Sequence, residues 1–427
     1  MALGVFLGTL LVFLAIGVPI AFSLVICAVA LMYFLNAFNP QIIAQNMVGG
    51  ANNFPLLAIP FFMLAGEIMG KGGLSQYIVE FANLVVGRVR GGLGYAAILA
   101  SMIFAGLSGA AVADTAAIGG ILLPMMVNNG YGKARSTGLI CASALLAPII
   151  PPSLPMIILG VTTGLSIGDL FMVGLVPGVI MGLILMITWS FIVRKEGYDS
   201  RVSYTKEEAI KILKKSLPAL VLPLIILIGI RFGVFTPTEA GSVAVVYAFL
   251  VSTLYYKELK AKDIPGIFVE AGKSTAVVVF VAAAAMAVAW LLTIAQIPDL
   301  VVSLFGGIVH KPLLLIFAIN LLLLGVGMVM DITPAIMILA PVLFPLIKAA
   351  GIHPIYFGLI MVLNLVIGLI TPPVGVVLYV GTGLSKISLT DLVKAILPFM
   401  LAEAISLLLF ILFPDLVMIP FHLITGK

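Results

Sequence analysis

Charged residues are scarce in this sequence. Asp, Glu, Lys and Arg make up only 9% of its 427 residues, whereas hydrophobic residues make up 63%, and the mean hydropathy is +1.29. A soluble protein carries roughly a quarter of its residues charged, so a soluble globular fold is excluded. A membrane β-barrel is also excluded, because its strands alternate apolar and polar residues, whereas residues 3–35 are almost uninterrupted apolar sequence.

Cysteine and histidine are equally sparse. Cys27 and Cys141 both lie within apolar runs, and His310, His353 and His422 are scattered without partners at helical spacing. This composition supports neither a disulfide framework nor a zinc or haem site. It also offers no nucleophile paired with a base, and no metal cluster, for catalysis. We therefore expect that the protein is not an enzyme.

Long apolar runs are abundant instead. Because a helix needs about 20 apolar residues to cross a bilayer, the pattern predicts an all-α polytopic membrane protein with about ten to twelve spans. The first run is predicted to be a retained span, since no basic segment typical of a signal peptide precedes it. Segments 74–90 and 259–272 mix polar and apolar residues, so an interfacial helix is the alternative for each. The predicted spans are residues 3–34, 54–70, 74–90, 136–163, 168–193, 217–234, 238–256, 275–297, 355–385 and 389–414.

Two further apolar runs, residues 93–130 and 312–350, are broken in the middle by Gly and Asp. Each is long enough to cross half the bilayer and return. We therefore predict two re-entrant helical hairpins. Each is followed by a segment interrupted by a Pro-Pro pair, within residues 136–163 and residues 355–385.

The basic residues predict the orientation of the chain. With the N-terminus outside, 17 of the 22 Lys and Arg residues fall on the cytoplasmic side, as the positive-inside rule requires. They do not gather on one amphipathic face with aromatics between them, so no nucleic-acid partner is expected despite the net charge of +5. The predicted cytoplasmic set is Arg88, Arg90, Lys133, Arg135, Arg194, Lys195, Arg201, Lys206, Lys211, Lys214, Lys215, Lys257, Lys260, Lys262, Lys273, Lys386 and Lys394. The predicted outer set is Lys71, Arg231, Lys311, Lys348 and Lys427.

One long polar segment divides the chain. We predict that residues 196–216 form a cytoplasmic interfacial linker, whose second half is an amphipathic helix because Ile210, Leu213 and Leu217 recur at helical spacing. A regulatory site is the alternative. The linker separates residues 1–195 from residues 217–427, which we predict to be two repeats.

The two halves share special residues in the same order. Their offsets lie between 217 and 221, so one step of a helical turn reconciles them. Because five full crossings are predicted in the first half, the second copy is expected to be inverted. Inverted repeats with broken helices are typical of secondary transporters. The matched residues are Pro19 with Pro237, Asp114 with Asp331, Pro124 with Pro341, Gly130 with Gly351, Pro151-Pro152 with Pro372-Pro373, Gly160 with Gly381, and Pro177 with Pro398.

The predicted hairpin tips combine small residues with one acid each. The first tip is residues 105–115 (AGLSGAAVADT) and the second is residues 325–334 (GVGMVMDITP). An ionisable residue inside a membrane segment is costly and usually faces a cavity or a partner. Asp114 and Asp331 are therefore predicted at the same depth beside a binding site. The alternative is that each acid only caps the returning helix.

The two Pro-Pro breaks lie in APIIPPS, residues 147–153, and in GLITPPVG, residues 368–375. Proline cannot donate a backbone hydrogen bond, so each pair leaves carbonyl groups of the preceding turn without a donor. A site made of oxygens alone suits Na⁺ better than a transition metal. A kink healed by a neighbouring Ser or Thr is the structural alternative. The positive ends of the half-helices favour an anionic substrate.

Three other acids are assigned to structure. We expect Glu67 and Glu403, which lie in apolar segments, to make packing or polar contacts rather than to act in function. Glu239 follows Thr-Pro-Thr at a predicted helix start, where it is favourable N-terminal chemistry.

Together these motifs resemble the large transmembrane subunit of TRAP transporters (tripartite ATP-independent periplasmic, DctM-like, of the ion transporter superfamily). The segments that carry the resemblance are residues 108–119 (SGAAVADTAAIG), 236–240 (TPTEA), 243–248 (VAVVYA) and 370–375 (ITPPVG). The resemblance implies Na⁺-driven uptake of a small organic acid across the bacterial inner membrane. It also implies an elevator mechanism, a periplasmic substrate-binding protein and a small four-helix membrane subunit, here expected as a separate chain. Ala111 departs from the family pattern, where a small hydroxyl residue often follows Ser-Gly.

The resemblance and the repeat together predict two Na⁺ sites and one substrate site between the hairpin tips. A stand-alone sodium/dicarboxylate-type symporter is the alternative, since it would share the hairpins and need no partner. The sequence does not identify the acid, and sialic acid, a dicarboxylate or a sugar acid would each fit. The predicted Na⁺ ligands are Ser108, Gly109, Pro148, Ile150 and Pro151 in one site, and Gly325, Gly327, Gly368, Ile370 and Thr371 in the other. The predicted substrate-binding residues are Ser108, Asp114, Thr115, Ser153, Asp331 and Thr333.

Overall fold

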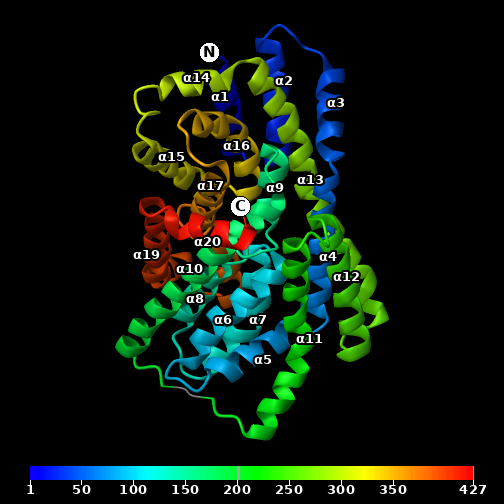
Figure 1. Ribbon diagram of the computed structural model, residues 1–427, viewed down its shortest axis with the longest axis vertical. Helices are drawn as coiled ribbons and strands as arrows, with labels where there is room; N and C mark the ends of the chain where they lie inside the picture. The colour runs from blue at the N-terminus through cyan, green and yellow to red at the C-terminus, as the bar shows by residue number, and fades with distance from the viewer. Residues whose placement is uncertain (200–201, 427) are drawn as a thin grey trace.

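Helices form all the regular structure in the part of the chain that the structure describes. The structure is a computed structural model, and it describes residues 1–199 and 202–426. The predicted positions of Arg201 and Lys427, and the middle of the predicted linker, lie outside the described residues. Eight helices of the described chain are long and apolar enough to cross a membrane. The predicted all-α polytopic membrane fold is confirmed (Figure 1).

The helices follow one another with short connections. The first half contains α1 (Ala2–Ala15), α2 (Ile20–Phe34), α3 (Pro40–Ala51), η1 (Phe54–Leu57), α4 (Ala58–Lys71), α5 (Leu74–Val86), α6 (Gly92–Ser108), α7 (Ala111–Asn128), α8 (Lys133–Ala144), α9 (Leu154–Thr163) and α10 (Ile167–Glu196). The second half contains α11 (Lys206–Arg231), α12 (Pro237–Leu250), η2 (Val251–Tyr255), η3 (Ala261–Asp263), α13 (Ile264–Ile294), α14 (Ile297–Leu304), α15 (Pro312–Gly327), α16 (Ile332–Ala349), α17 (Pro354–Gly368), α18 (Val376–Ser385), α19 (Leu389–Leu412) and α20 (Asp415–Thr425).

The first predicted span, residues 3–34, is wrong as a single helix. The chain leaves α1 at Gly17, which adopts a φ of +84°, and Pro19 precedes α2 with an extended backbone. Glycine tolerates this left-handed conformation, and proline cannot continue a helix. The two short helices pack against each other instead.

The helices α3 and α4 run together alongside α13 in the opposite direction (Figure 1). A Cβ added at Gly50 would lie 2.7 Å from the Met286 side chain, and further along the pair the Thr275 hydroxyl lies 3.7 Å from the sulfur of Met63. The sequence does not predict α3, and it predicts the start of α13 eleven residues too late. Polar residues within these helices explain both errors, since hydropathy recognises only the apolar part of a span.

Lys71 lies at the same end of the molecule as the start of α13. Its Nζ is 3.6 Å from the position of a Cβ added at Gly266. The charge pattern predicts Lys71 on the outer side, opposite Lys262, and this prediction is wrong. The predicted span 74–90 also fails, because α5 has 13 residues, or about 20 Å, which is too short to cross a bilayer. With Lys71 on the same side as the predicted cytoplasmic lysines and arginines, which we call the basic end, the difference in Lys and Arg content between the two sides increases.

The linker between the halves passes directly into a span. A capping box of Thr205 and Glu208 starts α11, which then continues without a break to Arg231. The predicted interfacial helix and the predicted span 217–234 are therefore one helix of 26 residues. The amphipathic pattern of its first turns is confirmed as helical, with Ile210 and Leu213 exposed.

The two halves contain equivalent helices in the same order. The segments α6–α7 and α15–α16 form the two predicted hairpins, and α8–α9 and α17–α18 are the two interrupted helices. Helices of the first half pack against helices of the second half. The contacting pairs are α9 with α16, α7 with α18, α2 with α13, and α4 with α12. Because the equivalent segments α3–α4 and α13 run antiparallel, the second half is inverted relative to the first. The inversion was predicted from five full crossings in the first half, and that count is wrong. The first predicted crossing is two short helices, α1 and α2, and α5 is too short to cross.

Candidate functional site

The tip of the first hairpin meets the first Pro-Pro break. Gly109 turns the chain from α6 into α7 with a φ of +64°, and a Cβ added there would lie 2.6 Å from the carbonyl oxygen of Pro152. The backbone N–H of Leu154 donates a hydrogen bond of 3.4 Å to the carbonyl of Gly109. Only glycine tolerates both the left-handed conformation and this close approach. The structure therefore brings the tip and the break into direct contact.

Ser108 and Asp114 form a polar pair inside this tip. The Ser108 hydroxyl donates a hydrogen bond to Oδ1 of Asp114, and it accepts one of 3.3 Å from the backbone N–H of Ala110. Asp114 is fully buried, and its second carboxylate oxygen has no hydrogen-bond partner among the described residues. Ala110, not Asp114, occupies the N-cap of α7 and no side chain caps the helix. The capping alternative for Asp114 is thus not what the structure shows.

Two predicted hydroxyl ligands are already hydrogen-bonded within the protein. Ser153 caps α9 by accepting from the N–H of Met156 at 3.2 Å, and its hydroxyl donates to the carbonyl oxygen of Pro148. Thr115 donates to the carbonyl of Ala111 at 2.8 Å. At the first break a serine therefore supplies a donor to a carbonyl freed by proline, as the structural alternative predicts. The Pro148 carbonyl keeps a second lone pair.

The second break contacts the end of α15. A Cβ added at Gly368 would lie 2.4 Å from the carbonyl carbon of Gly327, so the backbones touch where both predicted glycines lie. The N–H groups of Val374 and Gly375 both donate to the carbonyl of Met328, at 3.2 and 3.3 Å.

Two other predicted ligands of this break differ in their surroundings. Thr371 donates to the carbonyl of Ile367 at 2.7 Å. A Cβ added at Gly325 would meet no atom within 4 Å, so Gly325 is not brought against the break. Ile150 and Ile370, whose carbonyls are predicted ligands, are buried in the two breaks.

The two predicted acids are not structurally equivalent. Asp331 lies at the N-cap of α16, without a capping hydrogen bond from its side chain, and it is exposed. Asp114 lies four residues into α7 and is buried. The helices α7 and α16 both have 18 residues, and superposing their starts pairs Pro124 with Pro345 rather than Pro341. The predicted pairing of the two acids is therefore wrong by one helical turn.

A small cavity of about 130 Å³ lies between the two hairpin tips. Residues from both tips line it, together with residues from both breaks. Asp331 is its acidic group and Thr333 its hydroxyl from the second tip. Its lining includes Gly109, Ala110, Pro148, Asp331, Thr333 and Leu369. Four segments far apart in the sequence thus converge on one point.

A larger cavity, of about 620 Å³, lies on the other side of the first hairpin. It separates α6 and α7 from α4 and α13, and Ser108 and Glu67 line it from opposite walls. Within residues 1–199 and 202–426, no cluster of His, Cys, Asp and Glu is able to hold a metal ion. The arrangement offers isolated carboxylates, hydroxyls and carbonyl oxygens, which are ligands for hard cations rather than for soft transition metals.

A second layer of polar contacts, which the sequence motifs did not predict, lies behind the breaks. Ser101 donates to Ser143 between α6 and α8 at 3.0 Å, and Asn364 donates to the side-chain oxygen of Asn320 between α17 and α15 at 2.6 Å. Ser143 and Asn364 are separated by 221 residues, which is the offset of the Pro-Pro pairs. Aligning the two halves at that offset would have paired Ser143 with Asn364 and pointed to these polar contacts.

This fold, with two hairpins and two interrupted helices around a central cavity, defines a helical membrane transport protein. Residues 7–416 match the family described as tripartite ATP-independent periplasmic transporter, DctM component. The chain belongs to this family. It is a multi-pass protein of the bacterial inner membrane and not an enzyme. Membership implies a small membrane subunit and a periplasmic binding protein as partners.

The relatives cover nearly the whole chain. A putative TRAP transporter large permease protein of Haemophilus influenzae is 49% identical over 97% of this chain and 98% of its own length. The 2,3-diketo-L-gulonate TRAP transporter large permease protein YiaN of Escherichia coli is 48% identical over 98% of this chain and 99% of its own. The crystal structure of the Alcanivorax borkumensis YdaH transporter has a similar fold, with a TM-score of 0.60 at 15% identity over 87% of each chain.

Proposed function

We propose that this permease carries a small organic acid together with Na⁺ into the cell. A periplasmic binding protein delivers the acid, and a small four-helix membrane subunit completes the transporter. The observation that carries the proposal is the cavity of about 130 Å³ that both hairpin tips and both breaks line. A co-transport site needs such a point, where ligands from both halves meet.

Two Na⁺ sites belong to this proposal. Ser108, Gly109 and the carbonyls of the first break, including Pro148 and Pro151, hold one ion, and the unpartnered oxygen of Asp114 supports a cation close by. Gly327 and the carbonyls of the second break, with Thr371, hold the other. Carbonyl and hydroxyl oxygens at helix breaks are the ligands that such ions take in transporters. Each bound Na⁺ supplies positive charge that offsets the charge of an anionic substrate.

The proposed substrate site lies between the N-terminal ends of α7 and α16. Residues 110–112 and 331–333, which begin these helices, line the cavity. Helix N-termini carry partial positive charge and unpaired N–H groups, so they favour a carboxylate. Ser153 and Thr115 act on it only indirectly, since both hydroxyls are hydrogen-bonded within the protein. The E. coli relative is named for 2,3-diketo-L-gulonate, which supports a sugar acid within the wider class of small organic acids.

The proposed movement is of the elevator type. The hairpins, the interrupted helices, α10 and α19 move as one body against α1–α4 and α11–α13, and the cavity of about 620 Å³ lies between these two groups. The basic end of the molecule, which holds α5 and the start of α11 (Figure 1), faces the cytoplasm. Coupling requires that substrate and Na⁺ together favour the movement, because a ligand with equal affinity for both states shifts nothing.

The test uses proteoliposomes that contain the chain with its small subunit and are supplied with the binding protein. Uptake of sugar acids, sialic acids and C4-dicarboxylates is measured with and without an inward Na⁺ gradient. We expect uptake of one class that requires both the gradient and the binding protein. Asp114→Asn and Thr371→Ala should each lower it by about fivefold or more, since loss of a buried charged or hydroxyl ligand costs roughly 1–3 kcal/mol.

The matched control is Asp415→Asn, which removes an exposed carboxylate at the start of α20. Uptake without any Na⁺ gradient would overturn the coupling. Undiminished uptake without the binding protein would favour the stand-alone symporter instead.

A further inference from the structure

An apolar groove runs along the outer side of the bundle between α12 and α13. It encloses about 360 Å³, and all of its lining residues are hydrophobic. Ile68 of α4 and Ile267 form a buried floor. Val246, Leu250 and Phe268 form the walls and are exposed, with Val246 at 59% and Phe268 at 58%. The groove is therefore open to the surroundings of the protein along its length.

Lysines flank, in the sequence, a residue that lines one end of the groove. The loop from η2 to η3 contributes Leu259 to the lining, and Lys257, Lys260 and Lys262 lie on either side of it in the sequence. All three lysines are exposed, and none forms an ion pair with a described residue. From α4, Lys71 approaches the same end, with its Nζ 3.6 Å from a Cβ position at Gly266.

The acids of this region do not neutralise that end. The Cγ of Glu258 lies 3.1 Å from a Cβ position at Gly73, which directs this side chain toward the start of α5. Asp263 accepts a hydrogen bond of 3.2 Å from the backbone N–H of Lys260. Glu270 is paired with Lys273 at 2.8 Å. Lys257, Lys260 and Lys262 thus remain available to a ligand, whereas the charge of Lys71 acts on Glu270.

Two tyrosines attach this end of the groove to α11. Tyr255 donates to the carbonyl of Lys214 at 3.1 Å, and Tyr256 donates to the carbonyl of Lys215 at 2.7 Å. These bonds join the end of η2 to the basic first half of α11. Tyrosines and lysines at one level mark the boundary where lipid head groups lie.

We propose that this groove binds an anionic phospholipid of the cytoplasmic leaflet. An acyl chain lies between α12 and α13, and the phosphate contacts Lys257, Lys260 and Lys262. Basic pockets between membrane helices on the cytoplasmic side recognise anionic head groups in this way. A protein partner fits less well, because lysine is depleted at protein interfaces. This proposal rests on the membrane location of the chain and not on Na⁺ coupling or the transported acid.

The test is native mass spectrometry of the full-length chain purified in detergent as a complex with its small subunit, with phosphatidylglycerol and phosphatidylcholine added at equal concentration. We expect wild type to retain phosphatidylglycerol preferentially. The variant Lys257→Ala/Lys260→Ala/Lys262→Ala should lose at least about tenfold of this preference, since each lysine near an anionic surface attracts the charged head group. Val246→Trp, which fills the groove and keeps the lysines, should lower retention of both lipids.

The matched control is Lys133→Ala/Lys386→Ala/Lys394→Ala, which removes the same charge from other exposed positions and should keep the preference. Equal retention of the two lipids by wild type would overturn the proposal, and so would an unchanged preference in the first triple variant. Loss of the small subunit from the purified complex, with lipid retention intact, would show that the groove is a protein interface instead.

Discussion

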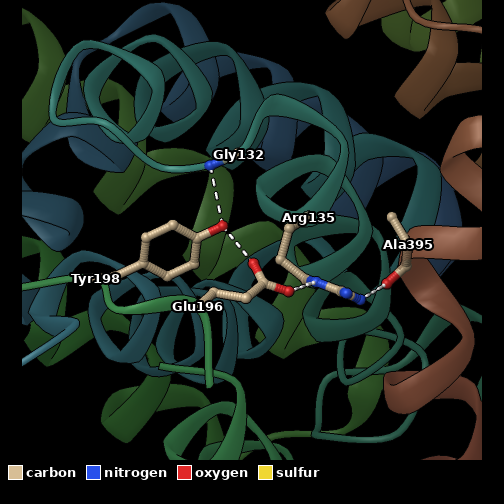
Figure 2. A network of polar contacts seen from close by, with 5 residues as sticks. All are labelled: Gly132, Arg135, Glu196, Tyr198 and Ala395. Carbon is tan, nitrogen blue, oxygen red and sulfur yellow. Dashed lines mark hydrogen bonds and ion pairs between the residues drawn. The ribbon is translucent and has the colours of Figure 1, made fainter. Parts of the chain in front are cut away.

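The guanidinium of Arg135 contacts the carboxylate of Glu196 at 2.8 Å and joins the start of α8 to the end of α10. Figure 2 shows that the same guanidinium donates a second hydrogen bond, to the backbone carbonyl of Ala395 in α19. The hydroxyl of Tyr198 donates to the other oxygen of Glu196 and accepts from the N–H of Gly132 at 3.1 Å. One arginine thereby connects three helices at the basic end of the molecule.

Replacing Arg135 with alanine is expected to destabilise the protein. The Arg135 side chain is only 22% exposed, and its loss leaves Glu196 and the Ala395 carbonyl without this donor. We expect the free energy of unfolding to fall by roughly 1–3 kcal/mol, seen as a lower Tm in detergent. Lys133→Ala, two residues earlier on an exposed position, should leave the Tm unchanged. An equal effect of both variants would contradict a specific stabilising role of the Arg135–Glu196–Tyr198 cluster.

Alkaline pH should weaken the same cluster. Burial, followed by the hydrogen bond to Glu196, raises the pKa of Tyr198 to about 12, whereas an unfolded tyrosine titrates at about 10. The folded state thus favours the neutral phenol, and this contribution is fully present below pH 10 and is lost as the pH rises toward 12. Tm measured across this interval should fall less steeply in Tyr198→Phe than in wild type. Identical slopes would show that Tyr198 does not contribute.

Gly109→Ala should abolish uptake without unfolding the protein. Alanine is disfavoured at a φ of +64° by about 1–2 kcal/mol, and its Cβ would lie 2.6 Å from a backbone oxygen of the first break. The hairpin tip must then move away from the proposed ion site. Gly272→Ala, at a position with no atom within 4 Å of the added Cβ, is the control in the proteoliposome assay. Uptake at the wild-type level by Gly109→Ala would contradict the close packing of the first hairpin tip against the first Pro-Pro break.

Glu403→Met should stabilise the protein. Glu403 is completely buried, and neither carboxylate oxygen has a hydrogen-bond partner among the described residues. Removing an unpaired buried polar group of similar size recovers roughly 1–3 kcal/mol. Thermal unfolding in detergent measures this gain, with Glu403→Ala as a comparison that leaves a cavity and should be less stable than Glu403→Met. A lower Tm for Glu403→Met would show that the carboxyl has a stabilising partner.

The hairpins and breaks were predictable because their causes are local. Proline pairs and glycine turns act on adjacent residues, so the predicted limits 93–130 and 312–350 nearly match the ends of the observed hairpins. The helix α13 was predicted too short, because Glu270 and Lys273 lower the hydropathy of a helix that other contacts extend. Lys71 was misplaced for a related reason, since the direction of a span depends on every span counted before it.

The relation between the two acids needed the structure. The first tip has two residues between its helices and the second has four. This difference moves Asp331 out of the helix, whereas Asp114 stays within it. A sequence alignment matches residue types and is insensitive to where a turn ends. The contact of Gly109 with Pro152 was likewise not predictable in detail, because it joins segments that only the tertiary fold brings together.

The exchange of helices between the halves has a consequence for biosynthesis. The helix α2 packs against α13, and α4 against α12, so the partners of the first half are made only when the second half is translated. At about 5–20 residues per second, the ribosome needs roughly 10–40 s to add 200 residues. During that time the newly inserted first half exposes unpaired helix faces to lipid and to other nascent chains. Truncation after α10 should therefore yield a product that the cell's membrane proteases degrade.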